Sequence, residues 1–411
     1  MFEENQIQYK LPNGITLLYD KVPGNKSFII SITTLAGSRD DFKGKSGLAH
    51  FVEHQLFRRN EKNSYSKIAR EFERTGTLYN AFTEHEMTLF FLKSLNEHFE
   101  KVYRLLTDFF ICPVFDAKDF QKEKKIILEE IKSYQDDPEE FIFDLGNEVL
   151  YPKNPLGGII TGTEKSIEKI EMEDIREFFE KYYFPENIVI SFVGDIPFDQ
   201  VRDISEKIFS DYSKPKTERV RAKLPENIVR SKVMKKSIEQ SHILLLRRFD
   251  TVDAEFSLKM RLLSYCLGES PSSMVYHNLR EKSGLVYNAF SNLEQYTDTN
   301  VLQLYFAIDK ENIDKSMKIL DEIEEKIKSK KISRELFTIS KSAMIAQHIY
   351  KLEIPYEKMM NNVKEYQLNG NFVFRDDFIE KMKLIKYEEF SDFAAKIISE
   401  QDWSGVKLLQ R

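Results

Sequence analysis

The chain of 411 residues repeats part of itself, and this repetition constrains the fold more than any other feature of the sequence. The stretch RTGTLYNAF at residues 74–82 matches KSGLVYNAF at residues 282–290, an offset of 208 residues, or about half the chain. Both stretches occupy the same place in two similar strings of predicted elements. An internal duplication therefore predicts an α+β fold of two homologous α/β domains, each an antiparallel or mixed sheet backed by helices.

The periodicity of apolar residues predicts the elements of both halves. In the first half we expect a hairpin at 7–22, a strand at 27–37, helices at 46–58 and 65–75, and two strands within 76–94. Long helices follow at 96–111, 117–135 and 139–150, then a buried strand at 186–196 and a closing helix at 199–212. The second half restarts with a strand, a helix and two strands at 241–249, 254–268, 283–292 and 299–308.

Between the halves lies a polar stretch, 213–230, which holds Pro215 and Pro225 and is the best candidate for a linker. We therefore expect an N-terminal domain over 1–215, a linker over 216–230 and a C-terminal domain over 231–411.

The charge balance argues against two classes of partner. Lys and Arg number 61 and Asp and Glu 67, a net charge of −6, which gives no electrostatic reason to bind nucleic acid or an anionic membrane. The N-terminus has no basic segment followed by an apolar one, and no window approaches 18 uninterrupted apolar residues. We expect a cytoplasmic protein, in which Cys112 and Cys266 are buried free thiols.

The stretch GLAHFVEHQLFRRN, residues 47–60, contains His50, Glu53 and His54 in the order H-x-x-E-H. On a helix, residues four apart lie one above the other, so the two imidazoles can face one cation. Catalytic zinc keeps three protein ligands and a water, and Glu53 would accept a proton from that zinc-bound water as general base. The alternative is two histidines without a ligand role, but with seven histidines in the chain the pattern arises by chance about once in a hundred.

The second half does not repeat this motif. The 208-residue offset places Leu258, Arg261 and Leu262 opposite His50, Glu53 and His54. Only the first half should therefore hold a metal, which predicts one Zn²⁺ per chain.

A third ligand is required, and the helix QKEKKIILEEIKSYQDD offers Glu123, Glu129 and Glu130. Glu123 and Glu130 are seven residues apart on one face, whereas Glu129 points away. A glutamate in a helix rich in Lys and Glu is more often exposed to solvent, so spacing alone leaves the choice open.

Several stretches together resemble one family. GSRDD, GKSGLAHFVEHQLF, NAFTEHEMT, EKKIILEEI and LREKSGLVY, in this order over essentially the whole chain, resemble the pitrilysin/insulinase/mitochondrial processing peptidase family of zinc metallopeptidases, the inverzincins, in its short two-domain form. The resemblance implies a processing-peptidase-like fold and zinc bound by His50, His54 and Glu130, with Glu123 as a supporting carboxylate. It makes the first domain catalytic and the second a substrate-binding domain without metal ligands.

The resemblance also implies substrate-binding residues. Asn80 and Ala81 correspond to an edge strand to which an extended peptide adds as a further strand. Arg280 and Tyr287 correspond to an Arg and a Tyr, seven apart, that hold substrate and help stabilise the oxyanion. His85 is not needed as a ligand, and Gln55 stands where the family usually has an apolar residue, often Met, which concerns packing more than ligation.

The sequence thus predicts a zinc-dependent endopeptidase that cleaves short unfolded peptides in an enclosed chamber. Long members of the family have four such domains, so the resemblance implies a homodimer of this chain or, less economically, a heterodimer with a related chain. Whether Arg280 and Tyr287 serve their own chain's metal or the partner's is left open, as is the natural substrate. The alternative is a non-catalytic peptide-binding or assembly subunit of the same fold.

Overall fold

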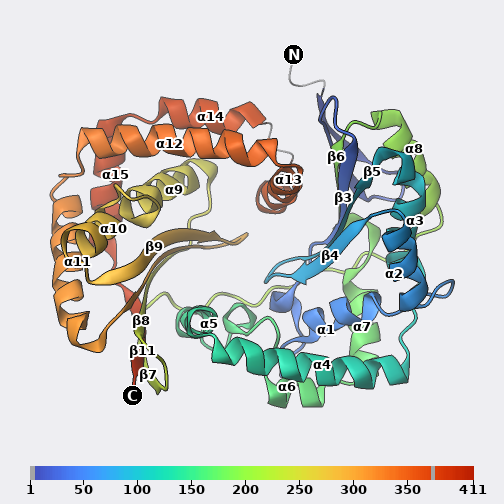
Figure 1. Ribbon diagram of the computed structural model, residues 1–411, viewed down its shortest axis with the longest axis horizontal. Helices are drawn as coiled ribbons and strands as arrows, with labels where there is room; N and C mark the ends of the chain where they lie inside the picture. The colour runs from blue at the N-terminus through green and yellow to red at the C-terminus, as the bar shows by residue number, and fades with distance from the viewer. Residues whose placement is uncertain (1–4, 372–374) are drawn as a thin grey trace. The chain divides into compact units, whose positions relative to one another are not determined.

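The computed structural model describes residues 5–371 and 375–411, which form two compact units (Figure 1). Unit 1 comprises Met1–Ser133, Gly158–Lys223 and Lys351–Phe374. Unit 2 comprises Tyr134–Gly157, Leu224–Tyr350 and Arg375–Arg411. Neither unit is a continuous stretch of sequence.

Unit 1 is built on a six-stranded sheet. Its spatial order is β1 (Gln6–Lys10), β2 (Thr16–Lys21), β6 (Ile188–Gly194), β3 (Ser27–Thr34), β5 (Thr88–Leu95) and β4 (Leu78–Thr83). β2 and β6 are parallel, and the other neighbours are antiparallel. β4 therefore lies at one edge of the sheet, with one side of its backbone unpaired within the sheet.

Helices cover both faces of this sheet because its residues alternate in direction along each strand. Phe28, Ile30 and Ile32 point into the larger core, whereas Ile29 points to the opposite face. That face is covered by α13 (Pro355–Asn369), which lies on the other side of β3 from α3 in Figure 1. The other helices of unit 1 are α1 (Leu48–Leu56), α2 (Tyr65–Arg74), α3 (Phe99–Ile111), α4 (Ala117–Asp136), α6 (Glu164–Lys169), α7 (Met172–Tyr182) and α8 (Phe198–Phe209).

Unit 2 has the same sheet without its first strand. The order is β7 (Ser231–Lys236), β11 (Ser404–Gln410), β8 (Ser241–Phe249), β10 (Asn300–Ile308) and β9 (Val286–Gln295). β7 and β11 are parallel and the other pairs antiparallel, as in β2–β6–β3–β5–β4. The expected fold class, two similar mixed sheets backed by helices, is confirmed. The offset of 208 applies to β4 and β9 but not throughout, since β3 begins at Ser27 and β8 at Ser241.

One face of the second sheet packs on a large apolar cluster, and the other face packs on a single helix. The clustered face involves α9 (Ala254–Gly268), α10 (Met274–Tyr276), α11 (Ile313–Lys328), α12 (Arg334–Glu353), α14 (Arg375–Leu384) and α15 (Tyr387–Glu400). The opposite face packs on α5 (Pro138–Leu150), through Ile142, Leu145 and Val149.

The two halves of the sequence exchange one helix. α5 belongs to the first half of the chain but packs in unit 2, and α13 belongs to the second half but packs in unit 1. The continuous ranges expected from the sequence, 1–215 and 231–411, therefore differ from the compact units by these helices. Periodicity shows that each helix has an apolar face, but it does not specify which sheet that face will cover.

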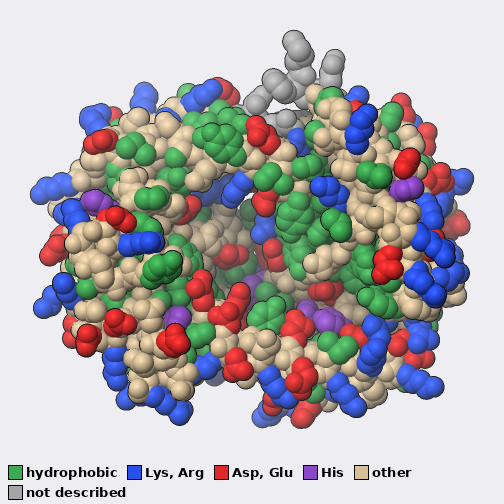
Figure 2. Space-filling model, viewed as in Figure 1, with side chains coloured by type: hydrophobic (Ala, Val, Ile, Leu, Met, Phe, Trp, Pro, Cys, Tyr) green, Lys and Arg blue, Asp and Glu red, His purple; other side chains and the backbone are tan. Residues whose placement is uncertain are grey.

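Other expectations concern single features. Residues 213–230 contain neither helix nor strand. Cys112 and Cys266 are free thiols, and Cys266 is buried as expected, whereas Cys112, at the end of α3, is only half-buried. Side chains of both charge signs are interspersed on the face shown in Figure 2. Among the residues that the structure describes, no helix combines the length and apolar character needed to cross a bilayer.

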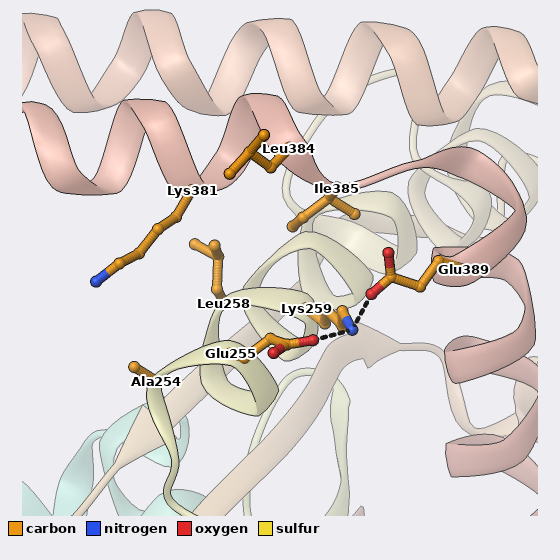
Figure 3. Close-up of a pocket in the computed structure, with 8 residues that line it drawn as sticks. All are labelled: Ala254, Glu255, Leu258, Lys259, Lys381, Leu384, Ile385 and Glu389. Atoms are coloured by element: carbon orange, nitrogen blue, oxygen red, sulfur yellow. Dashed lines mark hydrogen bonds and ion pairs between the residues drawn. The ribbon is translucent and has the colours of Figure 1, made fainter.

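A hollow of about 400 Å³ lies in unit 2 between the start of α9 and helices α14 and α15 (Figure 3). Lys259 lines it and forms ion pairs with Glu255, at 2.6 Å, and with Glu389. The apolar side chains of Leu258, Leu384 and Ile385 form the rest of its wall together with Lys381. The buried ammonium group of Lys259 is already paired with two carboxylates, so it is not left to bind a ligand in this hollow.

Candidate metal centre

The start of α1 is fixed by backbone geometry. Gly47, just before the helix, has φ of +91°, and a Cβ there would lie 2.6 Å from the carbonyl oxygen of Thr161, so only glycine fits. The Asp41 carboxylate accepts hydrogen bonds from the backbone N–H groups of Gly47 and Ala49, at 2.7 and 2.8 Å. These bonds satisfy donors that the first turn of a helix leaves without partners.

Three side chains from two helices converge next to this turn. The rings of His50 and His54 lie 4.6 Å apart between centroids on α1. Glu130 of α4 places its two carboxylate oxygens 3.6 Å from His50 Nε2 and 3.5 Å from His54 Nε2. One possible ligand atom from each of the three side chains lies within 4.8 Å of the other two. Over residues 5–371 and 375–411, no other three His, Cys, Asp or Glu side chains come together in this way.

Glu123 lies on the same face of α4 as Glu130. The two carboxylates approach the His54 ring at different nitrogens, Glu123 at Nδ1 and Glu130 at Nε2. One carboxylate oxygen of Glu123 is 3.0 Å from His54 Nδ1, and its other oxygen is 3.1 Å from Arg58 Nε. Glu123 is only 3% exposed, whereas the side chain of Glu129 is 74% exposed and pairs with Lys132. The carboxylate thus fixes the orientation of the His54 ring, as second-layer carboxylates do at metal sites.

The electrostatics of the group favour a cation. Burial lowers the pKa of His50 to about 4, so this ring is neutral. Burial opposes charge on His54 as well, but hydrogen bonds to Glu123 and Glu130 outweigh it and raise the pKa of His54 to about 9. Burial would raise the pKa of Glu130, but the hydrogen bond from His54 and the nearby histidines lower it. Two carboxylates therefore stabilise positive charge between them.

Glu53 lies on the same helix between the two histidines and is 8% exposed. Its Oε2 accepts a hydrogen bond of 2.6 Å from the hydroxyl of Thr83, the last residue of β4. Burial raises the pKa of Glu53 to about 7, which suits a group that takes up and releases a proton near neutrality. Sequence analysis missed Thr83, because nothing in the NAFTEHEMT stretch indicates a contact with a residue 30 positions earlier.

The loop that leads into α1 pairs with the β4–β5 turn. Ser38 N donates to the carbonyl oxygen of Glu84 at 3.1 Å, and Arg39 N donates to that of His85 at 2.8 Å. A Cβ at Gly37 would lie 2.1 Å from the Glu84 carbonyl oxygen, so this close approach requires glycine. The helix that carries the histidines and the hairpin that carries Thr83 are thereby joined.

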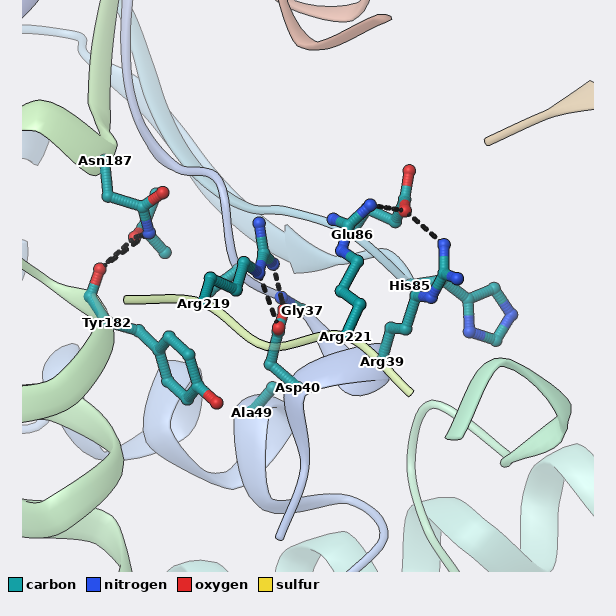
Figure 4. Close-up of polar contacts among 12 residues, drawn as sticks. Gly37, Arg39, Asp40, Ala49, His85, Glu86, Tyr182, Asn187, Arg219 and Arg221 are labelled. Carbon is teal, nitrogen blue, oxygen red and sulfur yellow. Dashed lines mark hydrogen bonds and ion pairs between the residues drawn. The ribbon is translucent and has the colours of Figure 1, made fainter. Parts of the chain in front are cut away.

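Buried ion pairs hold the same region (Figure 4). Glu86 pairs with Arg39 at 2.7 Å and with Arg221, and Arg219 pairs with Asp40, its Nε lying 2.7 Å from Oδ1. Arg219 and Arg221 come from the expected linker, whose first residues are thus anchored in unit 1. Both carboxylates are nearly fully buried, so these pairs hold the loop in one arrangement.

His85 lies apart from the metal centre. Its ring is buried, and its Nδ1 lies 2.9 Å from the hydroxyl of Ser38. Burial lowers its pKa to about 4. It is therefore a buried histidine held by a hydroxyl and does not belong to the group around His50.

Three of the remaining candidate residues, Asn80, Ala81 and Tyr287, lie on edge strands, and Arg280 lies in the short helical segment His277–Lys282. Asn80 and Ala81 are on β4, and Asn80 is exposed, with its Oδ1 accepting from Ala81 N at 2.9 Å. In unit 2, the guanidinium of Arg280 lies 5.1 Å from the ring centre of Tyr276 and 5.0 Å from that of Tyr287. Tyr287 is 78% exposed on the edge strand β9. The structure thus brings Arg280 and Tyr287 together in one unit, and His50, Glu53, His54, Glu123 and Glu130 together in the other.

Comparison with known proteins gives the family. Residues 17–164 match the family model described as insulinase (peptidase family M16), and residues 169–344 match the one described as peptidase M16 inactive domain. The chain belongs to the insulinase family. It is of the short two-domain type, because one model of each kind matches in succession.

Similar proteins span nearly the whole chain. An uncharacterized zinc protease of Bacillus subtilis is 29% identical and covers 96% of both chains, and one of Rickettsia felis is 27% identical and covers 98% of both. A solved structure of a protease from Helicobacter pylori has a TM-score of 0.88 at 21% identity, covering 98% of this chain and 99% of that one. A peptidase M16 inactive domain from Pseudomonas fluorescens has a TM-score of 0.90 at 17% identity, covering 99% and 100%.

The part that matches the inactive-domain model contains α9, the duplicate of α1. Leu258 and Leu262, which stand opposite the histidines by the 208-residue offset, are buried in the apolar cluster of unit 2. Arg261 donates from Nε to Gln295 Oε1 at 2.7 Å. In this insulinase-family chain, α9 thus has core leucines at the positions that carry histidines in α1.

Proposed function

We propose that this insulinase-family chain is a zinc-dependent endopeptidase with one Zn²⁺ bound by His50, His54 and Glu130. The observation that carries the proposal is the convergence of these three donors beside the buried carboxylate of Glu53. Two imidazole nitrogens and a carboxylate are a donor set that catalytic zinc takes, with a position left for water. The names of the relatives, zinc proteases, support the same metal.

When bound, the zinc ion supplies Lewis-acid chemistry, which polarises the peptide carbonyl and makes water more acidic. The chain's own residues do the rest. Glu53 accepts a proton from the attacking water and then donates it to the leaving amine nitrogen. Glu123 holds the His54 ring through Nδ1, so that Nε2 faces the centre.

The edge strand β4 would hold the substrate backbone. An extended peptide that adds beside Asn80 and Ala81 gains main-chain hydrogen bonds irrespective of its side chains, so unfolded peptides are the expected substrate class. Arg280 and Tyr287 would donate hydrogen bonds to the peptide and to the developing oxyanion. We further propose that the chain functions as a homodimer that encloses a chamber for short peptides, with a heterodimer of related chains as the alternative.

The Glu53→Gln variant tests the mechanism. Glutamine keeps the size of the side chain but cannot accept the proton, so turnover of a quenched, unstructured peptide should fall by at least about a thousandfold. Zinc content, measured by elemental analysis, should stay at that of the wild type, because Glu53 is not a ligand. Full activity in this variant would rule out Glu53 as the base.

Glu129→Gln is the matched control for this experiment. Glu129 lies beside Glu130 in the sequence, but its side chain is 74% exposed and pairs only with a surface lysine in the described contacts. The same substitution there should leave both turnover and zinc content unchanged.

A non-catalytic peptide-binding or assembly subunit of the same fold is the second candidate. It is favoured by the close structural match to a chain titled as an inactive domain. Zinc content and peptide turnover of the purified wild-type chain separate the two, because a scaffold has no need of His50, His54, Glu130 and Glu53 together. A chain that holds no zinc and binds peptide without cleaving it would favour the second candidate.

A further inference from the structure

We propose that Thr83 is a positioning residue for the general base: its hydroxyl holds one oxygen of the Glu53 carboxylate and links that carboxylate to the peptide-binding edge strand. The inference rests on the proposed function, in which Glu53 takes a proton from water. It concerns this threonine alone, whose hydroxyl, among the hydrogen bonds of residues 5–371 and 375–411, bonds to Glu53 and to none of the proposed metal ligands.

The contact itself is short and buried. Thr83 Oγ1 donates to Glu53 Oε2 at 2.6 Å, and the two residues are 9% and 8% exposed. A hydroxyl bonded to a carboxylate at this distance is a strong, charge-assisted hydrogen bond. Among the described contacts, Glu53 Oε1 receives no comparable bond, so Oε1 is the oxygen left to accept a proton.

The hydroxyl sits on a rigid support. Thr83 ends β4 opposite Thr88 of β5, and the turn between them closes with a hydrogen bond of 2.8 Å from Glu84 N to Met87 O. The same turn is pinned by the ion pairs of Glu86 with Arg39 and Arg221 (Figure 4). A group that aligns a catalytic side chain must itself be held in place, and this one is.

The strand connects the base to the substrate edge. Ala81 and Thr83 are two residues apart on β4 and so point to the same face of the sheet. A peptide that adds to β4 beside Asn80 and Ala81 would brace the strand whose last residue holds Glu53. Binding of the peptide backbone and alignment of the base would therefore be coupled through two residues of one strand.

The simpler alternative is that the bond only ties a strand to a helix, and the duplicated half contains such a tie. Ser291, 208 residues after Thr83, lies on β9 and donates to the backbone oxygen of Ser264 in α9 at 2.5 Å. There the hydroxyl donates to a main-chain oxygen, whereas in the first half it donates to the carboxylate proposed as the general base. The experiment must therefore measure more than stability.

Thr83→Val removes the hydroxyl and keeps the shape of the side chain. We expect kcat for a quenched, unstructured peptide to fall about 10- to 100-fold while KM stays within about twofold, because only alignment of the base is lost. Zinc content should not change. Thr83→Ser keeps the hydroxyl and should restore kcat to within about threefold of wild type; if the valine variant does not fold, Thr83→Ala replaces it.

Thr77→Val is the matched control. Thr77 is also a buried threonine, 6% exposed, and its hydroxyl bonds to Ser94 and Thr75, not to Glu53. Its loss should leave kcat unchanged.

Two results would overturn the inference: wild-type kcat in Thr83→Val, or a loss that Thr83→Ser does not restore. If Glu53→Gln remains active, the proposed function itself fails. If Glu53→Gln is inactive and Thr83→Val is fully active, only the role of Thr83 fails.

Discussion

Removal of polar side chains on α1 from water has a cost in stability, and two of these side chains recover it through a hydrogen-bond partner. Glu53 has the Thr83 hydroxyl, and His54 has Glu123. Gln55, one position further, is 1% exposed, and neither its Nε2 nor its Oε1 has a hydrogen-bond partner in the described part of the chain. A buried amide without partners lowers stability, because it has given up its bonds to water.

We therefore expect Gln55→Met to stabilise the protein. Methionine is similar in length and has no amide to satisfy, so the free energy of unfolding should rise by about 1–3 kcal/mol. Denaturant titration of the two proteins measures the difference. Gln6→Met is the opposite control, since Gln6 is also buried but donates to Asp20 at 2.8 Å, and its loss should lower stability. A Gln55→Met variant no more stable than wild type would contradict the assignment of an unsatisfied amide.

At the scale of secondary-structure elements, each half of the chain contributes one helix, α5 or α13, to the unit formed mostly by the other half. α5 packs on the second sheet at Gly146, where a Cβ would lie 2.8 Å from Leu244 and 3.0 Å from Leu246. α13 packs on the first sheet through Met359 and Val363. A residue of the first half of the chain therefore stabilises the unit made mostly of the second half.

Substitution of Gly146 by leucine should destabilise unit 2. The larger side chain has no room against the leucines of β8, and overpacking of this kind costs about 1–3 kcal/mol. Trp403, the single tryptophan of the chain, lies in unit 2, so its fluorescence reports the unfolding of that unit. We expect its transition to move to lower denaturant concentration.

Glu148→Leu is the matched control for this helix. Glu148 is exposed on the opposite face of α5, where it pairs with Lys232 at 2.7 Å. This substitution should change the Trp403 transition by less than about 0.5 kcal/mol, since exposed ion pairs contribute little. Equal effects of the two substitutions would show that α5 does not pack as described.

At the scale of the whole molecule, the proposed function gives the duplicated halves separate roles. One carries the proposed metal ligands His50 and His54 on α1, and the other has core leucines at the equivalent positions of α9 and contains Arg280 and Tyr287. In the proposed homodimer, Arg280 acts either on the metal centre of its own chain or on that of its partner.

Mixing two inactive variants distinguishes these arrangements. Glu53→Gln and Arg280→Ala should each be inactive alone. If Arg280 acts across the dimer, a mixed dimer contains one complete site, and an equal mixture after subunit exchange should recover about a quarter of wild-type activity. If Arg280 acts within its own chain, no activity returns. A purified chain that sediments as an inactive monomer would contradict the homodimer itself.

Local pattern was enough to predict most elements. The strand at 241–249 and the helix at 254–268 have the boundaries expected from the sequence, because their apolar residues recur with the period of a strand and of a helix. The ranges of the first half agree to within a few residues, since Gly, Pro and polar residues mark their ends. The positions of His50, Glu53 and His54 on one helix also followed from spacing alone.

What the sequence by itself determined is therefore the type and order of most elements, the duplication, and the two histidines and glutamate that one helix presents together; no prediction covered helices α6, α7, α14 and α15 or strands β7 and β11. The family resemblance, not residue spacing, implied Glu123 and Glu130. Only the tertiary structure decided that Thr83 holds Glu53, that Arg219 and Arg221 anchor the linker, and that α5 and α13 each pack on the sheet of the other half. The physical reason is the separation along the chain of the residues that interact. Helix and strand periods act between neighbours in the chain, whereas these contacts join residues brought together only when apolar faces choose which sheet to cover.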